Sequence, residues 1–122
     1  MPIDPSTQYL YLTTTGRSSG EPREIEIWFG LIGSTVYLLS GSGVDNGRPK
    51  AHWVRNILQK PEVTVRIDDV TYRGIARIVV PGTVEDTDAR ALLVAKYRGG
   101  SNGDLTKWGQ TALVVAVGVE SV

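Results

Sequence analysis

Residues 63–80 read VTVRIDDVTYRGIARIVV, two runs of alternating apolar and polar residues with an acidic pair between them. Alternation with a period of two is typical of half-buried β-strands. We therefore expect strands over residues 63–67 and 70–80, joined by a turn at Asp68-Asp69. Arg73 and Arg77 lie on one face of the longer strand. Its other face carries Val70, Tyr72, Gly74, Ala76, Ile78 and Val80.

Shorter segments of the same kind occupy much of the remaining chain. We expect strands over residues 9–14, 23–29 and 35–40, and over residues 111–119, which are almost continuously apolar. The pattern at 23–29 places Ile25, Ile27 and Phe29 on one face. We expect this segment to pair with 35–40 as a hairpin that turns at residues 30–34. The apolar run at 111–119 predicts burial on both faces.

Two segments favour helices. Pro49 is suited to open a helix over residues 50–59, because its fixed φ fits a first helical turn. Thr83 is suited to cap a helix over residues 85–97, which Gly99-Gly100 would end before a polar loop at residues 101–104. The sequence therefore predicts a mainly β fold with about six antiparallel strands and two short helices, closed or partly closed into a barrel. We expect one domain over residues 1–122.

Composition excludes several classes of function. The 13 Lys and Arg residues balance 13 Asp and Glu residues, so the chain lacks the basic excess that nucleic-acid binding requires. It has 0 cysteines and 1 histidine, His52, so thiolate chemistry is excluded and a metal site is not expected. Neither a leader peptide nor a membrane span is indicated, and we expect a cytoplasmic protein.

A first candidate binding element is the loop at residues 16–23. It combines Gly16, Gly20 and two serines with the guanidiniums of Arg17 and Arg23. Glycine lets backbone N–H groups approach an anion, and Arg offers a fixed fork of donors to phosphate or carboxylate. The same residues are also compatible with a plain connecting loop that carries two solvated arginines.

A second candidate binding element spans residues 40–56. Its candidate residues are Ser40, Gly41, Ser42, Gly43, Arg48, Lys50, His52, Trp53, Arg55 and Asn56. On a helix, Trp53 and Asn56 share a face, where they would border a planar ring, or instead pin the helix to the barrel and bond a loop carbonyl. His52 is a candidate proton donor beside a solvent path, but a satisfied or solvent-facing histidine fits the pattern better.

Two motifs resemble those of a known family. Residues 11–23, YLTTTGRSSGEPR, are similar to T-T-G-R-[KS]-[ST]-G-x-x-R, and residues 53–65, WVRNILQKPEVTV, are similar to W-x-x-N-[LI] followed by P-x-V-x-V. The chain thus resembles the deazaflavin-dependent nitroreductases and quinone reductases of the flavin-reductase-like split β-barrel superfamily. The resemblance covers nearly the whole chain. Ser18 stands where many members have Lys, and Arg48 and Lys50 would compensate for that charge.

The resemblance implies a split β-barrel oxidoreductase that passes hydride from the reduced 8-hydroxy-5-deazaflavin coenzyme F-420 to a quinone, a nitroaromatic or an activated enone. The implied tail ligands are Arg17, Ser18, Ser19, Gly20, Arg23, Arg48 and Lys50. Residues 40–43, Trp53 and Asn56 would border the ring, and Tyr97 and Trp108 the acceptor. Two alternatives stay open: an FMN-dependent enzyme of the same fold, and a non-catalytic barrel that carries a cofactor or lipid. A homodimer is compatible with the exposed face of residues 24, 26 and 28.

Overall fold

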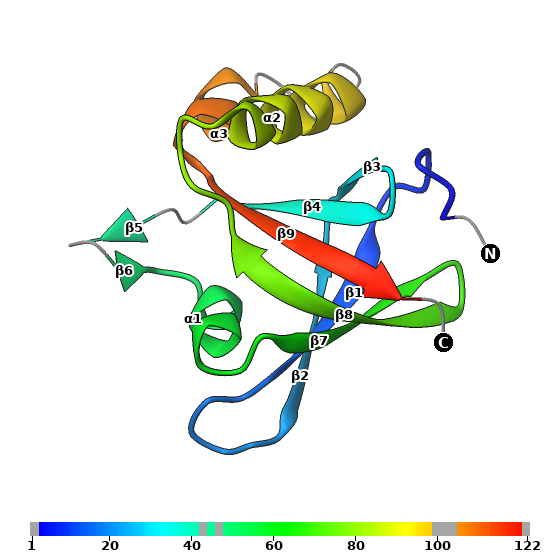
Figure 1. Ribbon diagram of the computed structural model, residues 1–122, viewed down its shortest axis with the longest axis vertical. Coiled ribbons are helices and arrows are strands. Elements are labelled where there is room, and N and C mark those ends of the chain that lie inside the picture. The colour runs from blue at the N-terminus through cyan, green and yellow to red at the C-terminus, as the bar shows by residue number, and fades with distance from the viewer. Residues whose placement is uncertain (1–2, 42–43, 46–47, 99–104, 121–122) are drawn as a thin grey trace.

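The computed structural model describes residues 3–41, 44–45, 48–98 and 105–120. Its main element is a seven-stranded antiparallel sheet, in the order β2-β1-β7-β8-β9-β4-β3, which curls into half a barrel (Figure 1). The strands are β1 (Leu10–Thr15), β2 (Pro22–Ile27), β3 (Gly30–Ile32), β4 (Thr35–Ser40), β7 (Glu62–Ile67), β8 (Val70–Ile78) and β9 (Leu113–Glu120). Strands β5 (Val44–Asp45) and β6 (Arg48–Pro49) pair separately as a short ribbon. The mainly β split barrel expected from the sequence is confirmed.

The expected pair of strands around Asp68-Asp69 forms the centre of the sheet. Both aspartates have positive φ, 51° and 66°, as a tight two-residue hairpin requires. The alternation holds along β8, where Tyr72, Gly74 and Ala76 are buried. It ends at residue 78, since Val79 is buried and Val80 is 66% exposed. The strand is therefore shorter than residues 70–80, and Val80 does not share the inner face.

The hairpin expected between residues 23–29 and 35–40 is wrong. Strand β2 pairs with β1, whereas β4 pairs with β9 and, through a turn at Gly33 with a φ of 61°, with β3. Trp28 and Phe29 lie between β2 and β3 and carry the chain from one edge of the sheet to the other. The chain passes close to helix α2 (Val84–Tyr97) at Gly30, where an added Cβ would lie 2.8 Å from Leu92 Cδ2. A residue without a side chain therefore fits best at this point of the crossing. No periodicity in the sequence signals that the chain crosses here from one edge of the sheet to the other.

Two apolar cores lie on opposite faces of the sheet. Residues including Leu12, Val65 and Val115 fill the inside of the barrel. A second core, with Leu39, Val114 and Leu93, lies between the outer face of β4 and β9 and the helix α2. Strand β9 is consequently buried on both faces from Leu113 to Val117, as its sequence predicts.

The helices differ more from expectation. Helix α1 (His52–Gln59) begins two residues later than expected, because Pro49 pairs with Val44 in the ribbon instead of opening the helix. Helix α2 (Val84–Tyr97) is capped as predicted, with the Thr83 side chain accepting from the Asp86 N–H. Its expected glycine end at residues 99–100 lies outside the described residues.

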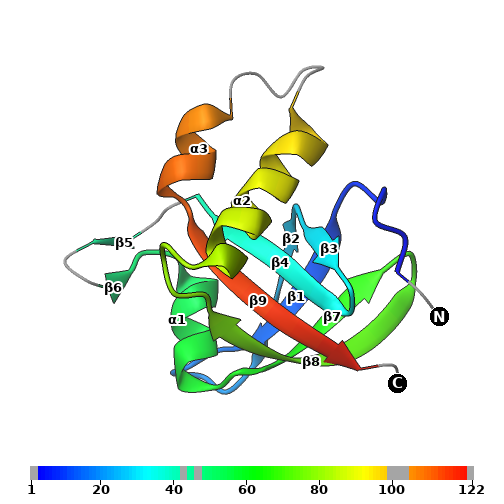
Figure 2. The ribbon, with the colours of Figure 1, turned by 45° about the horizontal axis from the view of Figure 1, so that its top comes forward.

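A third helix was not predicted. Helix α3 (Thr106–Thr111) precedes β9, so the strand begins at Leu113 instead of Thr111. Figure 2 shows α2 and α3 side by side over one face of the sheet, with α1 on the other side of the molecule near the β1–β2 loop. Among the described residues, no helix has both the length and the apolar character needed to cross a membrane.

Candidate functional site

The β1–β2 loop forms a tight turn with exposed hydroxyl groups. The Gly16 N–H donates to Glu21 O at 2.8 Å, and the Gly20 N–H donates to Gly16 O at 2.8 Å. Gly20 has a φ of 73°, a left-handed conformation that glycine adopts without strain. Ser19 Oγ accepts from the Glu21 N–H at 3.2 Å and from Arg23 Nη2 at 3.4 Å. The loop thus holds its serines and Arg23 close together.

Asn56 of α1 binds this loop. Its Oδ1 accepts from the Arg17 N–H at 3.2 Å and from Arg17 Nη1 at 2.9 Å. Its Nδ2 donates to Thr14 Oγ1 at 3.1 Å, and the residue is 4% exposed. The sequence left open whether Asn56 borders a ligand or bonds the loop. The structure has it bond the loop through the Arg17 backbone and side chain, while it also lines the pocket described below.

His52 is the second partner of Arg17 on α1. Its Nδ1 lies 3.1 Å from Arg17 Nη2, and its carbonyl oxygen lies 3.5 Å from Arg17 Nη1. Because a guanidinium only donates, Nδ1 must accept in this pair. A neutral His52 therefore carries its proton on Nε2. The contact orients both side chains at the mouth of the loop.

A pocket of about 460 Å³ lies between the loop and α1. It is lined by Thr14, Gly16, Arg17, Ser18, Ser19, Arg23, Ile25, His52, Trp53 and Asn56. We call it the donor pocket, because two guanidiniums and several hydroxyls line it and no carboxylate does. Neither Arg17 nor Arg23 forms an ion pair with a described carboxylate. Such a donor set matches a phosphate or carboxylate group.

A second pocket of about 240 Å³ follows the first along β2. We call it the aromatic pocket; it is lined by Glu26, Ile27, Trp28, Leu39 and Trp108. The rings of Trp28 and Trp108 meet edge to face, with centroids 5.7 Å apart at 87°. Ile25 of the donor pocket and Ile27 of the aromatic pocket lie on the same face of β2, roughly 7 Å apart by strand geometry. The two pockets are thus neighbours along β2.

Tyr97 supports the aromatic pocket from inside the fold. Its ring stacks on Trp28, with centroids 4.2 Å apart at 7°, and the residue is 1% exposed. Its hydroxyl accepts from the Phe29 N–H at 2.9 Å and donates to Gln8 O at 2.7 Å. Burial raises its pKa to about 12. Tyr97 lines neither pocket, and its burial does not favour the acceptor contact predicted for it.

The remaining residues predicted to bind the cofactor line neither pocket where the structure describes them. Ser40 is buried at the end of β4, and a Cβ added to Gly41 would lie 3.4 Å from Trp108 Cδ1. Lys50 is exposed and lines neither pocket. Ser42 and Gly43, and the side chain of Arg48, lie outside the described residues. Trp28 was missed as a site residue because only the crossing between β2 and β3 brings it beside Trp108.

A further pocket of about 490 Å³ lies on the outer face of the sheet. Its charged lining is mixed, with Lys60 and Arg73 beside Glu62 and Glu120. The pocket is slightly larger than the donor pocket. Its mixture of positive and negative side chains, however, does not favour an anionic ligand. We therefore place the candidate site at the donor and aromatic pockets.

Comparisons with known proteins agree with the split-barrel fold described above. The structure is similar to an F₄₂₀H₂-dependent reductase (FDR-A), with a TM-score of 0.68, 20% identity and coverage of 96% of this chain and 98% of that chain. It is also similar to an F₄₂₀ reductase, with a TM-score of 0.64, 23% identity and coverage of 94% and 88%. The heme storage protein HutZ from Vibrio cholerae shares the fold, with a TM-score of 0.74, 14% identity and coverage of 95% and 84%. At these identities the likenesses establish the fold alone.

The sequence itself settles the family. No curated protein sequence matches the chain. The profile of the F₄₂₀H₂-dependent quinone reductases matches residues 4–120, nearly the whole length. The chain therefore belongs to the F₄₂₀H₂-dependent quinone reductase family, and it is a deazaflavin-dependent reductase whose cofactor is coenzyme F-420.

Proposed function

We propose that this reductase binds the anionic tail of coenzyme F-420 in the donor pocket and reduces a quinone that lies in the aromatic pocket. The observation that carries the proposal is the order of the pockets along β2. A lining of guanidiniums and hydroxyls is followed by a lining of two indoles. The acidic tail of the cofactor, followed by a planar acceptor, matches that order of chemistry.

The donor pocket fits a phosphate-bearing tail. Arg17, Ser18, Ser19 and Arg23 supply charged and neutral donors, and Gly16 lines the pocket with its backbone. Arg17 is already oriented by Asn56, which reduces the ordering cost of binding. Arg48 and Lys50 remain proposed as further tail contacts from the segment that follows β4.

The ring of the cofactor is proposed to lie beside Trp53 and the end of β4. Trp53 is half-buried and lines the donor pocket, whereas Ser40 and Gly41 lead toward Trp108. When bound, the reduced coenzyme supplies a hydride to the acceptor. The chain's own contribution is to hold donor and acceptor close and in a fixed orientation, which is the main part of the protein's catalytic work in cofactor enzymes.

The aromatic pocket selects flat acceptors. Trp28 and Trp108 offer ring faces and edges to a conjugated, electron-poor molecule. Quinones, nitroaromatics and activated enones all have this character, and the family favours quinones among them. The proposed proton source is either solvent or His52, whose Nε2–H is not engaged by Arg17.

A titration tests the cofactor site. Fluorescence titration with F-420 should give tighter binding than titration with FMN. Arg17→Ala should weaken F-420 binding by about 1.5–3 kcal/mol, roughly 10- to 150-fold in Kd, because a charge-assisted contact is lost. Arg73→Ala, on the outer face of the sheet, is the matched control. Unchanged affinity in Arg17→Ala would remove the donor pocket from the site.

An acceptor panel tests the reaction. Reduction rates with quinones, nitroaromatics and enones should be highest for quinones, and Trp108→Ala should lower the rates for all three. Binding of F-420 without reduction of any acceptor would instead favour the non-catalytic barrel. We also propose a homodimer, which size-exclusion chromatography with light scattering would test; one similar structure, with a TM-score of 0.69 and 20% identity, is described as a domain-swapped dimer.

A further inference from the structure

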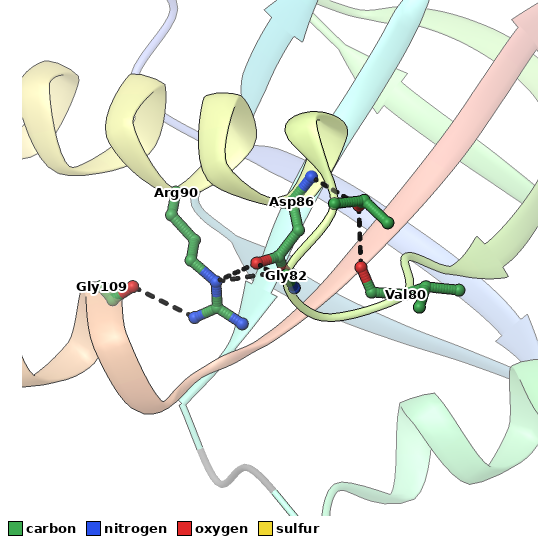
Figure 3. Close-up of polar contacts among 6 residues, drawn as sticks. Val80, Gly82, Asp86, Arg90 and Gly109 are labelled. Atoms are coloured by element: carbon green, nitrogen blue, oxygen red, sulfur yellow. Dashed lines mark hydrogen bonds and ion pairs between the residues drawn. The ribbon is translucent and has the colours of Figure 1, made fainter.

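Arg90 of α2 forms a part-buried ion pair with Asp86 on the same helix and a hydrogen bond to α3 (Figure 3). Its Nε donates to Asp86 Oδ1 at 3.1 Å and to Oδ2 at 3.0 Å. Its Nη1 donates to the carbonyl oxygen of Gly109 in α3 at 3.1 Å. The Arg90 and Asp86 side chains are 19% and 8% exposed. At this burial, loss of one partner leaves a charge or a carbonyl without its bond.

The Asp86 carboxylate is itself fixed at the start of α2. Its Oδ2 accepts from the Gly82 N–H at 3.3 Å, and its own N–H donates to Thr83 Oγ1 at 3.2 Å. Thr83 Oγ1 donates in turn to Val80 O at 2.8 Å, at the corner between β8 and α2. Arg90 is therefore held by a carboxylate that the backbone of this corner anchors.

Helix α3 depends on α2 for its position. It has six residues and no side-chain cap, and so short a helix is not stable in isolation. Gly109 is buried, and an added Cβ would clash with Val94 Cγ2 of α2. The two helices therefore pack in close contact at Gly109, beside the carbonyl that Arg90 binds.

Trp108 is the residue before Gly109, and its indole lines the aromatic pocket. We propose that Asp86 and Arg90 are positioning residues for Trp108, and that through it they set the size and shape of the acceptor that the aromatic pocket takes. This inference rests on the proposed function, because it assumes that the acceptor lies against Trp108. Neither Asp86 nor Arg90 lines either pocket, so they act only through α3.

The donor pocket provides an internal reference for this inference. It is built from the β1–β2 loop and α1, and none of its lining residues belongs to α2 or α3. A shift of α3 should therefore alter acceptor kinetics and leave the affinity for F-420 unchanged. A general loss of packing would alter both.

Four variants of the α2–α3 contact test the proposal. Arg90→Ala removes the hydrogen bond to Gly109, and Arg90→Lys keeps the charge. Gly109→Ala forces a clash with Val94, and the double variant Gly109→Ala/Val94→Ala makes room for the new methyl group. Arg77→Ala is the matched control, because Arg77 binds Glu85, the neighbour of Asp86 on α2, without contacting α3.

Three measurements distinguish the outcomes. Near-UV circular dichroism reports the Trp28–Trp108 pair, with Trp108→Phe as its reference. The KM and kcat for quinones of two sizes report the acceptor site, and fluorescence titration gives the Kd for F-420. We expect Arg90→Ala and Gly109→Ala to change the dichroism as Trp108→Phe does and to lower kcat/KM for quinones by about 5- to 100-fold, a cost typical of small misplacements.

The same variants should leave the Kd for F-420 within about twofold, a change smaller than one lost contact produces. Val94→Ala should restore the Gly109→Ala enzyme, and Arg90→Lys should recover part of the loss. Unchanged dichroism in Arg90→Ala, or equal losses in Kd and kcat/KM, would overturn the inference. If Trp108→Phe leaves quinone kinetics intact while Arg90→Ala still alters the dichroism, the proposed acceptor site is wrong and the structural coupling stands.

Discussion

Two donors of Arg17 converge on one oxygen of Asn56, the backbone N at 3.2 Å and Nη1 at 2.9 Å. The residues are 39 positions apart, one in the β1–β2 loop and one on α1. Asn56 Nδ2 donates to Thr14, so its amide orientation is fixed from both ends. This single side chain connects the loop backbone, the loop charge and the helix that together enclose the donor pocket.

Asn56→Ala should therefore both destabilise the fold and weaken cofactor binding. Loss of a buried hydrogen-bonding side chain should lower the free energy of unfolding by about 1–3 kcal/mol, measured by urea denaturation. Without Asn56, Arg17 is no longer held in its orientation, and F-420 binding should weaken by about 1–2 kcal/mol, roughly 5- to 30-fold in Kd. Gly74→Ala is the control, because it is expected to cost similar stability and Gly74 does not line the donor pocket. Equal Kd values in Asn56→Ala and wild type would contradict the role given to Asn56.

Much of the sheet could be predicted from the sequence because its signals are local. The alternation in residues 63–80 and the Asp68-Asp69 turn gave β7 and β8, and the Thr83 cap gave the start of α2. The loop at residues 16–23 and the face of Trp53 and Asn56 on α1 were identified separately, and the structure brings them together in one pocket.

The crossing at Trp28-Phe29 and helix α3 could not be predicted in this way. The choice of β1 instead of β4 as the partner of β2 depends on curvature of the whole sheet, to which residues 23–29 give no local clue. Helix α3 has little helical signal of its own and is defined by its contact with Val94 and Arg90. The aromatic pocket depends on both features, which explains why Trp28 was missed.

Two glycines in neighbouring strands should differ in how strongly the same substitution affects stability. A Cβ at Gly74 would lie 2.6 Å from Val117 Cγ1 and 3.0 Å from the backbone oxygen of Gly118, whereas a Cβ at Gly118 would meet nothing within 4 Å. Gly74→Ala should lower the free energy of unfolding by about 1–3 kcal/mol through overpacking. Gly118→Ala should change it by less than about 0.5 kcal/mol. Thermal or urea unfolding of both variants measures the difference. A loss of stability in Gly74→Ala as small as that in Gly118→Ala would show that β8 accommodates the methyl group.

Glu85 should make the protein sensitive to acid. The hydrogen bonds from Arg77 and then Tyr37 lower the pKa of Glu85 from 4.5 to about 2. The folded state therefore holds the carboxylate charged, and its stabilisation is complete above pH 4.5 and is lost as the pH falls toward 2. Glu85→Gln should flatten the pH dependence of stability in this window, measured by urea unfolding at successive pH values. Arg77→Gln should flatten it as well, since it removes the main cause of the shift; an unaltered acid limb in both variants would refute the assignment.

Lys96 should act in the opposite pH range. Its Nζ lies 3.7 Å from the centre of the Phe29 ring and donates to Phe29 O at 2.9 Å. Burial lowers its pKa from 10.5 to about 8, against an opposing attraction from Asp4. The folded state thus releases the proton of Lys96 before the unfolded state does.

Stability should consequently rise with pH between about 8 and 10.5, because the cost of burying the charged ammonium is relieved there. Lys96→Met should remove this rise, whereas Lys60→Met, at an exposed lysine, controls for loss of a positive charge. The comparison is best made below pH 10. Above that value the raised pKa of Tyr97, about 12, causes stability to fall with pH instead. A slope between pH 8 and 10 that is the same in Lys96→Met as in wild type would show that the ammonium of Lys96 is solvated in the folded protein.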